Sequence, residues 1–191
     1  MESVSVAMIR ERLAGIPQFP LPPPYSARWH RPGDEAAWLR IHRAADALNT
    51  FPEGKFREQF GDDHGPLARR QLYLCDALGR EIGTATAWRN DRYRGRPFGR
   101  LHWVAIVPEE QGRGLAKPLL TLACNRLLEL GHESAYLTTN TARTAAVNLY
   151  LKFGFVPDIR ADRELEAWRR LREVVAPAYW AAAVAAVPGL A

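Results

Sequence analysis

The chain has 191 residues, 47% of them hydrophobic and 25% charged, and its formal net charge is +5 at pH 7. This length and balance predict one soluble domain with a sizeable core. The 23 arginines and three lysines are scattered. They do not alternate with aromatic residues as in a single-strand binding groove, so nucleic acid is not an expected partner.

The first third of the chain is predicted to hold an extension, one strand and two helices. Prolines concentrated between Pro17 and Pro24 indicate an extended segment, and residues 1–24 are assigned to a Pro-rich N-terminal extension. The first helix is predicted from apolar residues that share one helical face: Trp38, Ile41, Ala45 and Leu48. The predicted elements are a strand over Ser26–His30, a helix from Asp34 to about Leu48, and a helix over Lys55–Phe60.

The middle of the chain is predicted to be rich in strands, over Gln71–Cys75, Ile82–Trp88 and Leu101–Val107. Between the last two, Arg89–Arg100 contains five arginines and one acidic residue. We interpret this segment as a solvated hairpin loop. The alternative is a contact for an acidic acceptor or for nucleic acid.

The last part of the chain is predicted to alternate helices and strands. The expected elements are a helix over Leu115–Leu130, a strand over Ser134–Thr139, a helix over Thr144–Phe153, a short strand at Phe155-Val156 and a helix over Ala161–Val175. From Val174 onward the chain carries no charge for 18 residues, but Pro177 and Pro188 interrupt it. We therefore predict a tail that packs on the domain or across a homodimer, and no membrane segment.

Cysteine usage and the N-terminus both indicate a cytoplasmic protein. Cys75 and Cys124 lie far apart in apolar runs, which favours reduced core thiols over a disulfide. Met1–Arg12 has no apolar stretch of the kind that a signal peptide needs. The five histidines show no metal-ligand spacing, so no metal cofactor is expected.

The segment that carries most information about function is the connection between Leu101–Val107 and the helix that follows. The apolar run stops at Pro108, and a turn containing Gly112 and Gly114 leads into the helix. A glycine turn at a helix start presents unpaired N–H groups, backed by the positive end of the helix dipole. Phosphate is the commonest occupant of such a site, and the alternative is a tight connection without a ligand.

Two motifs resemble the GNAT superfamily of acyl-CoA-dependent N-acetyltransferases. Gln111-x-x-Gly114-x-Ala116 is similar to the family's pyrophosphate signature, and Leu149–Phe155 is similar to its L-Y-x-x-x-G-F segment. The resemblance covers residues 25–157. It implies an α/β GNAT fold with a mixed central sheet and flanking helices. The chain departs from the family after this region: the helical spacing of Ala161–Val175 predicts that residues 158–191 form a helical C-terminal extension in place of the usual last strand hairpin.

The resemblance implies acetyl-CoA as co-substrate and identifies the residues that contact it. The pyrophosphate is expected at the backbone N–H groups of Gln111, Gly112, Arg113, Gly114, Leu115 and Ala116. The pantetheine amides are expected at the backbone edge of Ala105, Ile106 and Val107. Arg143 stands where the family commonly has an asparagine, so Arg143 and the nearby Asn148 are further candidates for CoA contacts.

Two residues are candidates for proton transfer. Tyr150 matches the family tyrosine that protonates the leaving thiolate, and a phenol is protonated at pH 7 and can donate. His102 matches a strand histidine of the serotonin-type N-acetyltransferases, and an imidazole accepts a proton near neutral pH. Strand alternation places His102 on the same face as Val104 and Ile106. The alternative for both residues is a purely structural core role.

The sequence therefore predicts an N-acetyltransferase that acts on a primary amine of a small molecule, peptide or protein by direct attack. A second hypothesis is a non-catalytic acyl-CoA-binding sensor or interaction module of the same fold. The motif residues Gln111 and Tyr150 favour the enzyme. Arg143 and the helical extension keep the second hypothesis open.

Overall fold

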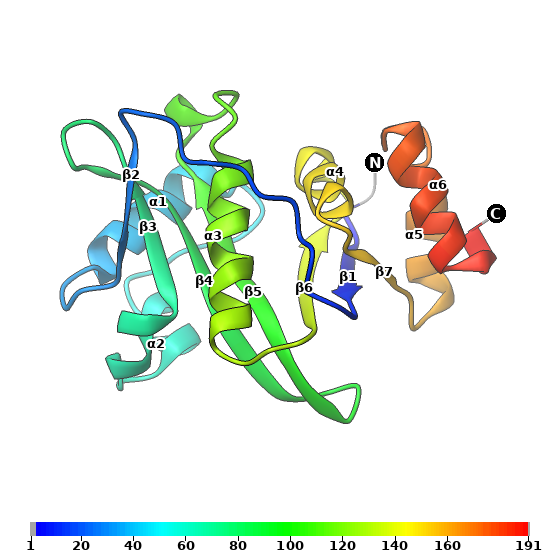
Figure 1. Ribbon diagram of the computed structural model, residues 1–191, viewed down its shortest axis with the longest axis horizontal. Helices are drawn as coiled ribbons and strands as arrows, with labels where there is room; N and C mark the ends of the chain where they lie inside the picture. Colours follow the sequence, from blue (N-terminus) through cyan, green and yellow to red (C-terminus); the bar gives the residue numbers. More distant parts are fainter. Residues whose placement is uncertain (1–2, 191) are drawn as a thin grey trace. The chain divides into compact units, whose positions relative to one another are not determined.

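The computed structural model describes residues 3–190, and residues 1–2 and 191 of the predicted extensions lie outside the described part. Seven strands form one mixed sheet in the order β2-β3-β4-β5-β6-β1-β7, with helices between the strands (Figure 1). This arrangement confirms the predicted α/β fold. The chain divides into two compact units, and strands β4 and β5 run through both.

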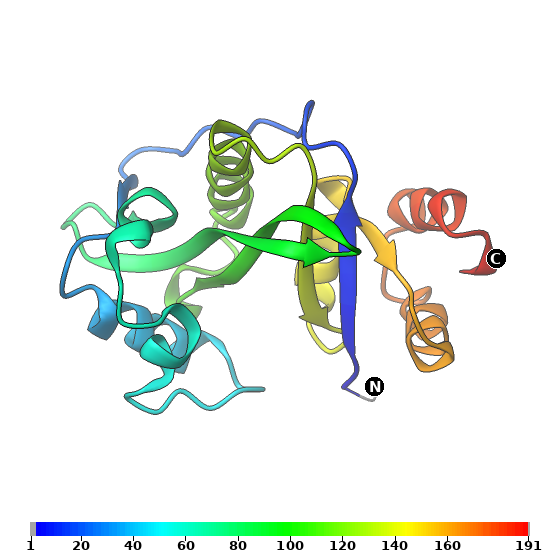
Figure 2. The same ribbon diagram turned by 90° about the horizontal axis from the view of Figure 1, so that it is seen from below.

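The α3 unit comprises Gln18–Arg89 and Leu101–Leu130. Its elements are β2 (Ser26–Trp29), α1 (Glu35–Ala45), α2 (Lys55–Phe60), β3 (Gln71–Cys75), β4 (Glu81–Tyr93), β5 (Arg96–Ile106) and α3 (Ala116–Glu129), with short 3-10 turns at Gly65–Arg69 and Pro108–Glu110. Helix α3 covers one face of the strands in this unit, and α1 and α2 cover the other (Figure 2). The two layers enclose the sheet between them.

The core of the α3 unit beneath α1 and α2 is aromatic. The Trp38 ring is fully buried, and it meets Phe56 and Phe60 edge-on with ring centroids 5.4 and 5.7 Å apart. The predicted helix is shorter than expected, because Asp46 accepts a hydrogen bond from the backbone N–H of Leu48 and ends α1. Leu48, predicted on the buried face, is consequently exposed.

The α4 unit comprises Met1–Pro17, Asn90–Arg100 and Gly131–Ala191. Its elements are β1 (Ser5–Arg10), the hairpin end of β4 and β5, β6 (Ala135–Asn140), α4 (Thr144–Lys152), β7 (Val156–Asp158), α5 (Asp162–Leu171) and α6 (Pro177–Ala186), with a 3-10 turn at Pro188–Leu190. Strand β1 pairs antiparallel with both β6 and β7. Strand β1 was not predicted from the sequence, because its residues lie in the segment that we interpret as a Pro-rich N-terminal extension.

The arginine-rich segment 89–100 is not a loop, so that prediction is wrong. Strand β4 continues to Tyr93 and β5 begins at Arg96, which leaves Arg94 and Gly95 as a two-residue turn. Both turn residues have positive φ, 51° and 76°, as a tight hairpin requires. Tyr93 and Phe98 are buried here, and the Tyr93 ring stacks on Tyr136 with centroids 3.6 Å apart.

The uncharged tail packs within the α4 unit. Helix α6 contacts β7 and α4, and Val175 and Ala183 are buried. Cys75 and Cys124 are buried thiols that are not joined in a disulfide, as predicted. Among the described residues, every helix is too short or too polar to cross a membrane.

Candidate functional site

The predicted cofactor segment lies in the α3 unit, where β5 leads through a turn into α3. The backbone N–H of Val107 donates to the carbonyl of Ile82 in β4 at 2.9 Å, so Val107 is paired within the sheet. The polar groups of successive residues point to opposite sides of a strand, so those of Ile106 point away from β4. The Ile106 carbonyl accepts a hydrogen bond of 2.8 Å from Nε2 of Gln111. The side chain of Gln111 thus fixes the turn against the strand.

Strand β4 approaches this segment closely at Gly83. A Cβ at position 83 would lie 3.0 Å from Cγ1 of Ile106 and 3.1 Å from the carbonyl oxygen of Ala105. A side chain at position 83 would therefore push Ile106 or the Ala105 carbonyl away by a few tenths of an ångström. The position of Ala105 and Ile106 therefore depends on Gly83 having no Cβ.

The turn itself has the geometry of an anion site. Gly112 and Gly114 have φ of +77° and +80°, and a Cβ on either would meet open space. Helix α3 begins directly after them, and its first turn contains Lys117 and no acidic side chain. The N–H of Lys117 donates to the carbonyl of Gly114 at 3.3 Å, that of Gln111 donates to the carbonyl of Pro108 at 3.2 Å, and Pro118 has no N–H. The N–H groups that suit an anion are therefore those of the turn from Gly112 to Ala116, which the positive end of the helix dipole supports. These residues fit a pyrophosphate group.

Arg113, also predicted to contact the cofactor, forms a small network with the N-terminal part of the unit. Its guanidinium lies 3.2 Å from Oε2 of Glu110 and donates to the Tyr25 hydroxyl at 3.2 Å. Tyr25 in turn donates to Glu110 at 2.9 Å. Glu110 is buried and lies in the 3-10 turn that precedes the glycine turn. Tyr25 and Glu110 were not predicted to support the turn.

His102 lies on β5 with its side chain buried among aromatic rings. Its ring centroid is 5.9 Å from that of Phe60 at the end of α2. The next residue, Trp103, has φ of 51°, and its indole N–H donates to Oε1 of Gln59 at 3.0 Å. A left-handed residue interrupts the strand pleat. Simple alternation therefore does not place His102 on the face of Val104 and Ile106.

The remaining predicted residues lie on or beside α4 in the α4 unit. Tyr150 is buried, and its ring centroid is 6.3 Å from that of Phe155. Arg143 is the residue before α4, and its backbone N–H donates to the carbonyl of Asn140 at 2.9 Å. Tyr150 thus lies within a helix of the same unit as Arg143 and Asn148.

The amide of Asn148 holds the C-terminal extension. Its Nδ2 donates to the carbonyl of Val174 at 3.1 Å, and its Oδ1 accepts from the N–H of Ala176 at 2.9 Å. A third bond runs from Nδ2 to the carbonyl of Thr144. Asn148 therefore anchors the start of α6. Its predicted contact with CoA stays a prediction.

Residues 34–155 match the family model described as "Acetyltransferase (GNAT) family". The chain belongs to the GNAT acetyltransferase family. The match spans both motifs that carry the resemblance in the sequence. It also includes His102, the turn before α3 and Tyr150.

Sequence relatives agree with this membership. Mycothiol acetyltransferase of Pseudarthrobacter chlorophenolicus is 33% identical over 154 residues, which cover 74% of this chain and 46% of the relative. Mycothiol acetyltransferase of Nocardia farcinica is 35% identical over 138 residues, or 66% of this chain and 43% of the relative. The chain thus spans about half the length of the curated relatives it matches.

The fold is shared with solved GNAT structures. A GCN5-related N-acetyltransferase from Sphaerobacter thermophilus superposes with a TM-score of 0.67 at 21% identity, covering 81% of this chain and 48% of that one. The ribosomal-protein-S18-alanine N-acetyltransferase from Escherichia coli gives a TM-score of 0.52 at 22% identity, covering 66% of this chain and 74% of that one. At these identities the similarity shows the fold alone.

Proposed function

We propose that this chain transfers an acetyl group from acetyl-CoA to a primary amine. The observation that carries the proposal is the turn before α3, with two left-handed glycines and a helix start free of acidic side chains. That arrangement suits the pyrophosphate of CoA. The Ile106 N–H, which points away from β4, suits an amide carbonyl of the pantetheine arm.

In the proposed reaction the neutral amine attacks the thioester carbonyl carbon directly. A C–N bond forms, the C–S bond breaks, and the thiolate takes up a proton. We assign His102 as the base that accepts the amine proton and Tyr150 as the acid that protonates the thiolate. The assignments rest on the match of both residues to the family pattern and on their chemistry.

We propose that the acceptor is a small molecule and not a peptide or protein. The curated relatives are named mycothiol acetyltransferases, so the amine acceptor of such an enzyme is the first acceptor to test. His102 adds a second argument, because the rings of Phe60 and Trp103 border it. Aromatic surroundings favour an acceptor that buries its apolar part and presents one amine.

The decisive experiment measures free thiol released from acetyl-CoA in the presence of a panel of amines, with CoA binding measured in parallel by calorimetry. The proposal expects both binding and amine-dependent thiol release. Binding without release for any amine would favour the alternative of a non-catalytic acyl-CoA-binding module. Absence of binding would overturn both.

A further inference from the structure

Two histidines and a glutamate converge on one side of the α3 unit, away from the turn before α3. His30 follows β2, Glu35 is the first residue of α1, and His64 precedes the 3-10 turn at Gly65–Arg69. Each offers one ligand atom, and these atoms lie within 4.8 Å of one another. We propose that His30, Glu35 and His64 form a binding site for a divalent transition-metal ion of the Zn²⁺ class.

The first argument is the state of the His30 ring. Its side chain is only 2% exposed, and its Nε2 is buried without a hydrogen-bond partner among the residues that the structure describes. Its Nδ1 lies 2.9 Å from Oε1 of Gln71, an oxygen that also accepts from the Tyr73 hydroxyl at 2.8 Å. Because Gln71 Oε1 is an acceptor, Nδ1 carries the hydrogen and Nε2 carries the lone pair.

A buried neutral imidazole with one nitrogen donating to a fixed acceptor is the form in which histidine binds metals. A metal ion would give the lone pair of His30 Nε2 a partner.

The second argument is the contact between Glu35 and His64. Nδ1 of His64 lies 2.8 Å from Oε1 of Glu35, and Nε2 of His64 lies 3.2 Å from the carbonyl of Gly61. Both ring nitrogens thus face acceptors. A His64 ring with its hydrogen on Nδ1 donates it to the Glu35 carboxylate, which holds the two side chains together. A metal ion can take the place of the Nδ1 proton.

Two of the three side chains are partly exposed, which allows the small movement that coordination requires. Ligand atoms around a tetrahedral Zn²⁺ lie roughly 3.3 Å from one another. The candidate ligand atoms of His30, Glu35 and His64 lie up to 4.8 Å apart, so they must move closer together to bind the ion. The side chains of His64 and Glu35 are 29% and 32% exposed, so both can rotate toward His30. Their exposure also opens the site to the ion and to the water that completes its coordination.

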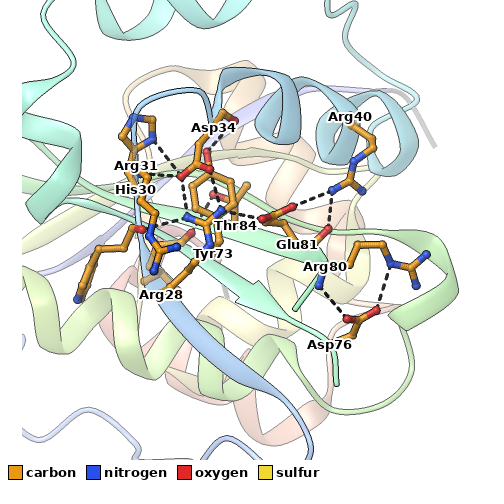
Figure 3. A network of polar contacts seen from close by, with 12 residues as sticks. Arg28, His30, Arg31, Asp34, Arg40, Tyr73, Asp76, Arg80, Glu81 and Thr84 are labelled. Atoms are coloured by element: carbon orange, nitrogen blue, oxygen red, sulfur yellow. Dashed lines mark hydrogen bonds and ion pairs between the residues drawn. The ribbon is translucent and has the colours of Figure 1, made fainter. Parts of the chain in front are cut away.

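The neighbouring acid, Asp34, is already committed elsewhere. Arg28 donates to both of its carboxylate oxygens at 2.7 Å, and the backbone N–H of Arg31 donates to one of them (Figure 3). The site therefore has two imidazole nitrogens and one carboxylate oxygen from the protein. Imidazole ligands select Zn²⁺, Co²⁺, Ni²⁺ or Cu²⁺ over Mg²⁺ and Ca²⁺, which prefer oxygen.

The ion would join three segments that are distant in sequence. It would tie the start of α1 and the end of β2 to the segment that follows α2. Helix α2 in turn holds β5, through Gln59 bonded to Trp103 and Phe60 packed near His102. Metal binding is thus expected to brace the layer of the unit that covers His102.

The test titrates Zn²⁺ into the full chain after removal of metal with a chelator, with binding followed by competition against a chromophoric chelator. We expect one Zn²⁺ per chain. Glu35→Gln and His64→Gln should each weaken binding by roughly 10- to 100-fold or more. Both side chains are partly exposed, so the variants should fold, and circular dichroism checks this.

Matched controls are Glu58→Gln and His132→Gln, which remove an acid and a histidine outside the cluster and should bind Zn²⁺ as the parent chain does. Substitution with Co²⁺ should give the visible absorption of a tetrahedral site in the parent and lose it in His64→Gln. Absence of stoichiometric binding in the parent would overturn the proposal, as would unchanged binding in both cluster variants. None of these measurements depends on acetyl transfer, so they stand apart from the proposed function.

Discussion

The Tyr93 hydroxyl donates a hydrogen bond of 2.5 Å to the Asp158 carboxylate, which joins the β4–β5 hairpin to β7 across 65 positions of sequence. Asp158 is fully buried and also pairs with Arg94 and with Arg160, the latter at 2.7 Å. Burial alone would raise the pKa of Asp158. The hydrogen bonds from Arg160, Tyr93 and Arg94 outweigh it, and the pKa is lowered.

We predict that Asp158→Asn lowers the free energy of unfolding at pH 7 by about 1–3 kcal/mol, since both arginines are half-exposed and screened. A depressed pKa contributes stability that is present above the unfolded value, near 3.9, and is lost as pH falls through the folded value. The difference between parent and variant should therefore shrink below about pH 4. Urea unfolding at several pH values measures it, and Tyr93→Phe should cost only about 1 kcal/mol.

The second prediction concerns the close approach of β4 to the predicted cofactor strand. Gly83→Ala should destabilise the protein by about 1–3 kcal/mol, because its Cβ would press on Ile106 and on the Ala105 carbonyl. The KM for acetyl-CoA should rise as the strand shifts. Gly54→Ala is the control, because a Cβ there meets open space, and its effect should stay within about 0.5 kcal/mol. Equal melting of both variants would contradict the prediction.

The third prediction concerns the turn before α3. Acetyl-CoA at a hundredfold excess over Kd should stabilise the chain by about 2.7 kcal/mol. Gly114→Glu should abolish this shift, because its carboxylate would occupy the expected pyrophosphate position. Gly114→Ala introduces the same left-handed backbone strain at φ +80° without the charge, so it should retain most of the shift. Unchanged melting of the parent at millimolar acetyl-CoA would remove the cofactor assignment.

The fourth prediction concerns the C-terminal extension. Helix α6 buries Ala183 but exposes Ala178, Ala182 and Ala185 on one helical face. We predict that this face forms a homodimer, and that deleting residues 174–191 costs solubility because Val175 and the contacts of Asn148 are lost. Ala182→Glu should keep the fold and shift the mass in light scattering from dimer to monomer. A soluble, equally stable truncation would contradict the packing role.

Local patterns in the sequence are sufficient to predict most helices and strands and the glycine turn. The turn is predictable because Gly112 and Gly114 lie between a β-branched run and a helix, and both adopt the expected positive φ. Strand β1 was missed, although Val4, Val6 and Met8 alternate with small or polar residues. Because several prolines follow this segment, the sequence was interpreted as an extended N-terminal extension without a strand. The alternation was the signal that would have identified it.

Features that depend on long-range contacts were not predictable. No local sequence pattern predicts the positive φ of Trp103. The indole of Trp103 bonds to Gln59 on α2, a contact that only the folded chain brings together. His30 and His64 show no metal-ligand spacing because 34 positions separate them, and only the fold places them beside Glu35. The role of Asn148 at the C-terminal extension likewise depends on a segment 26 to 28 positions away.

The last prediction concerns proton transfer and ranks Tyr150 above His102. Protonation of a thiolate accelerates the reaction only if the donor lies at the sulphur, and the Leu149-Tyr150 motif match assigns the phenol to that role. Tyr150→Phe keeps the buried ring, so stability and CoA affinity should barely change. Turnover should fall on the order of 10²–10⁴-fold, the usual contribution of a positioned acid or base.

The matched control is Tyr179→Phe on α6, which removes a phenol from a half-buried position and should leave turnover unchanged. His102→Gln should cost less than Tyr150→Phe if water relays the amine proton, and it should alter the acidic limb of the pH–rate profile if His102 is the base. Thiol release at fixed times, measured over a range of pH, gives the turnover of each variant. Full turnover in Tyr150→Phe, with CoA still bound, would mean that the thiolate leaves without an acid and that the assignment of Tyr150 is wrong.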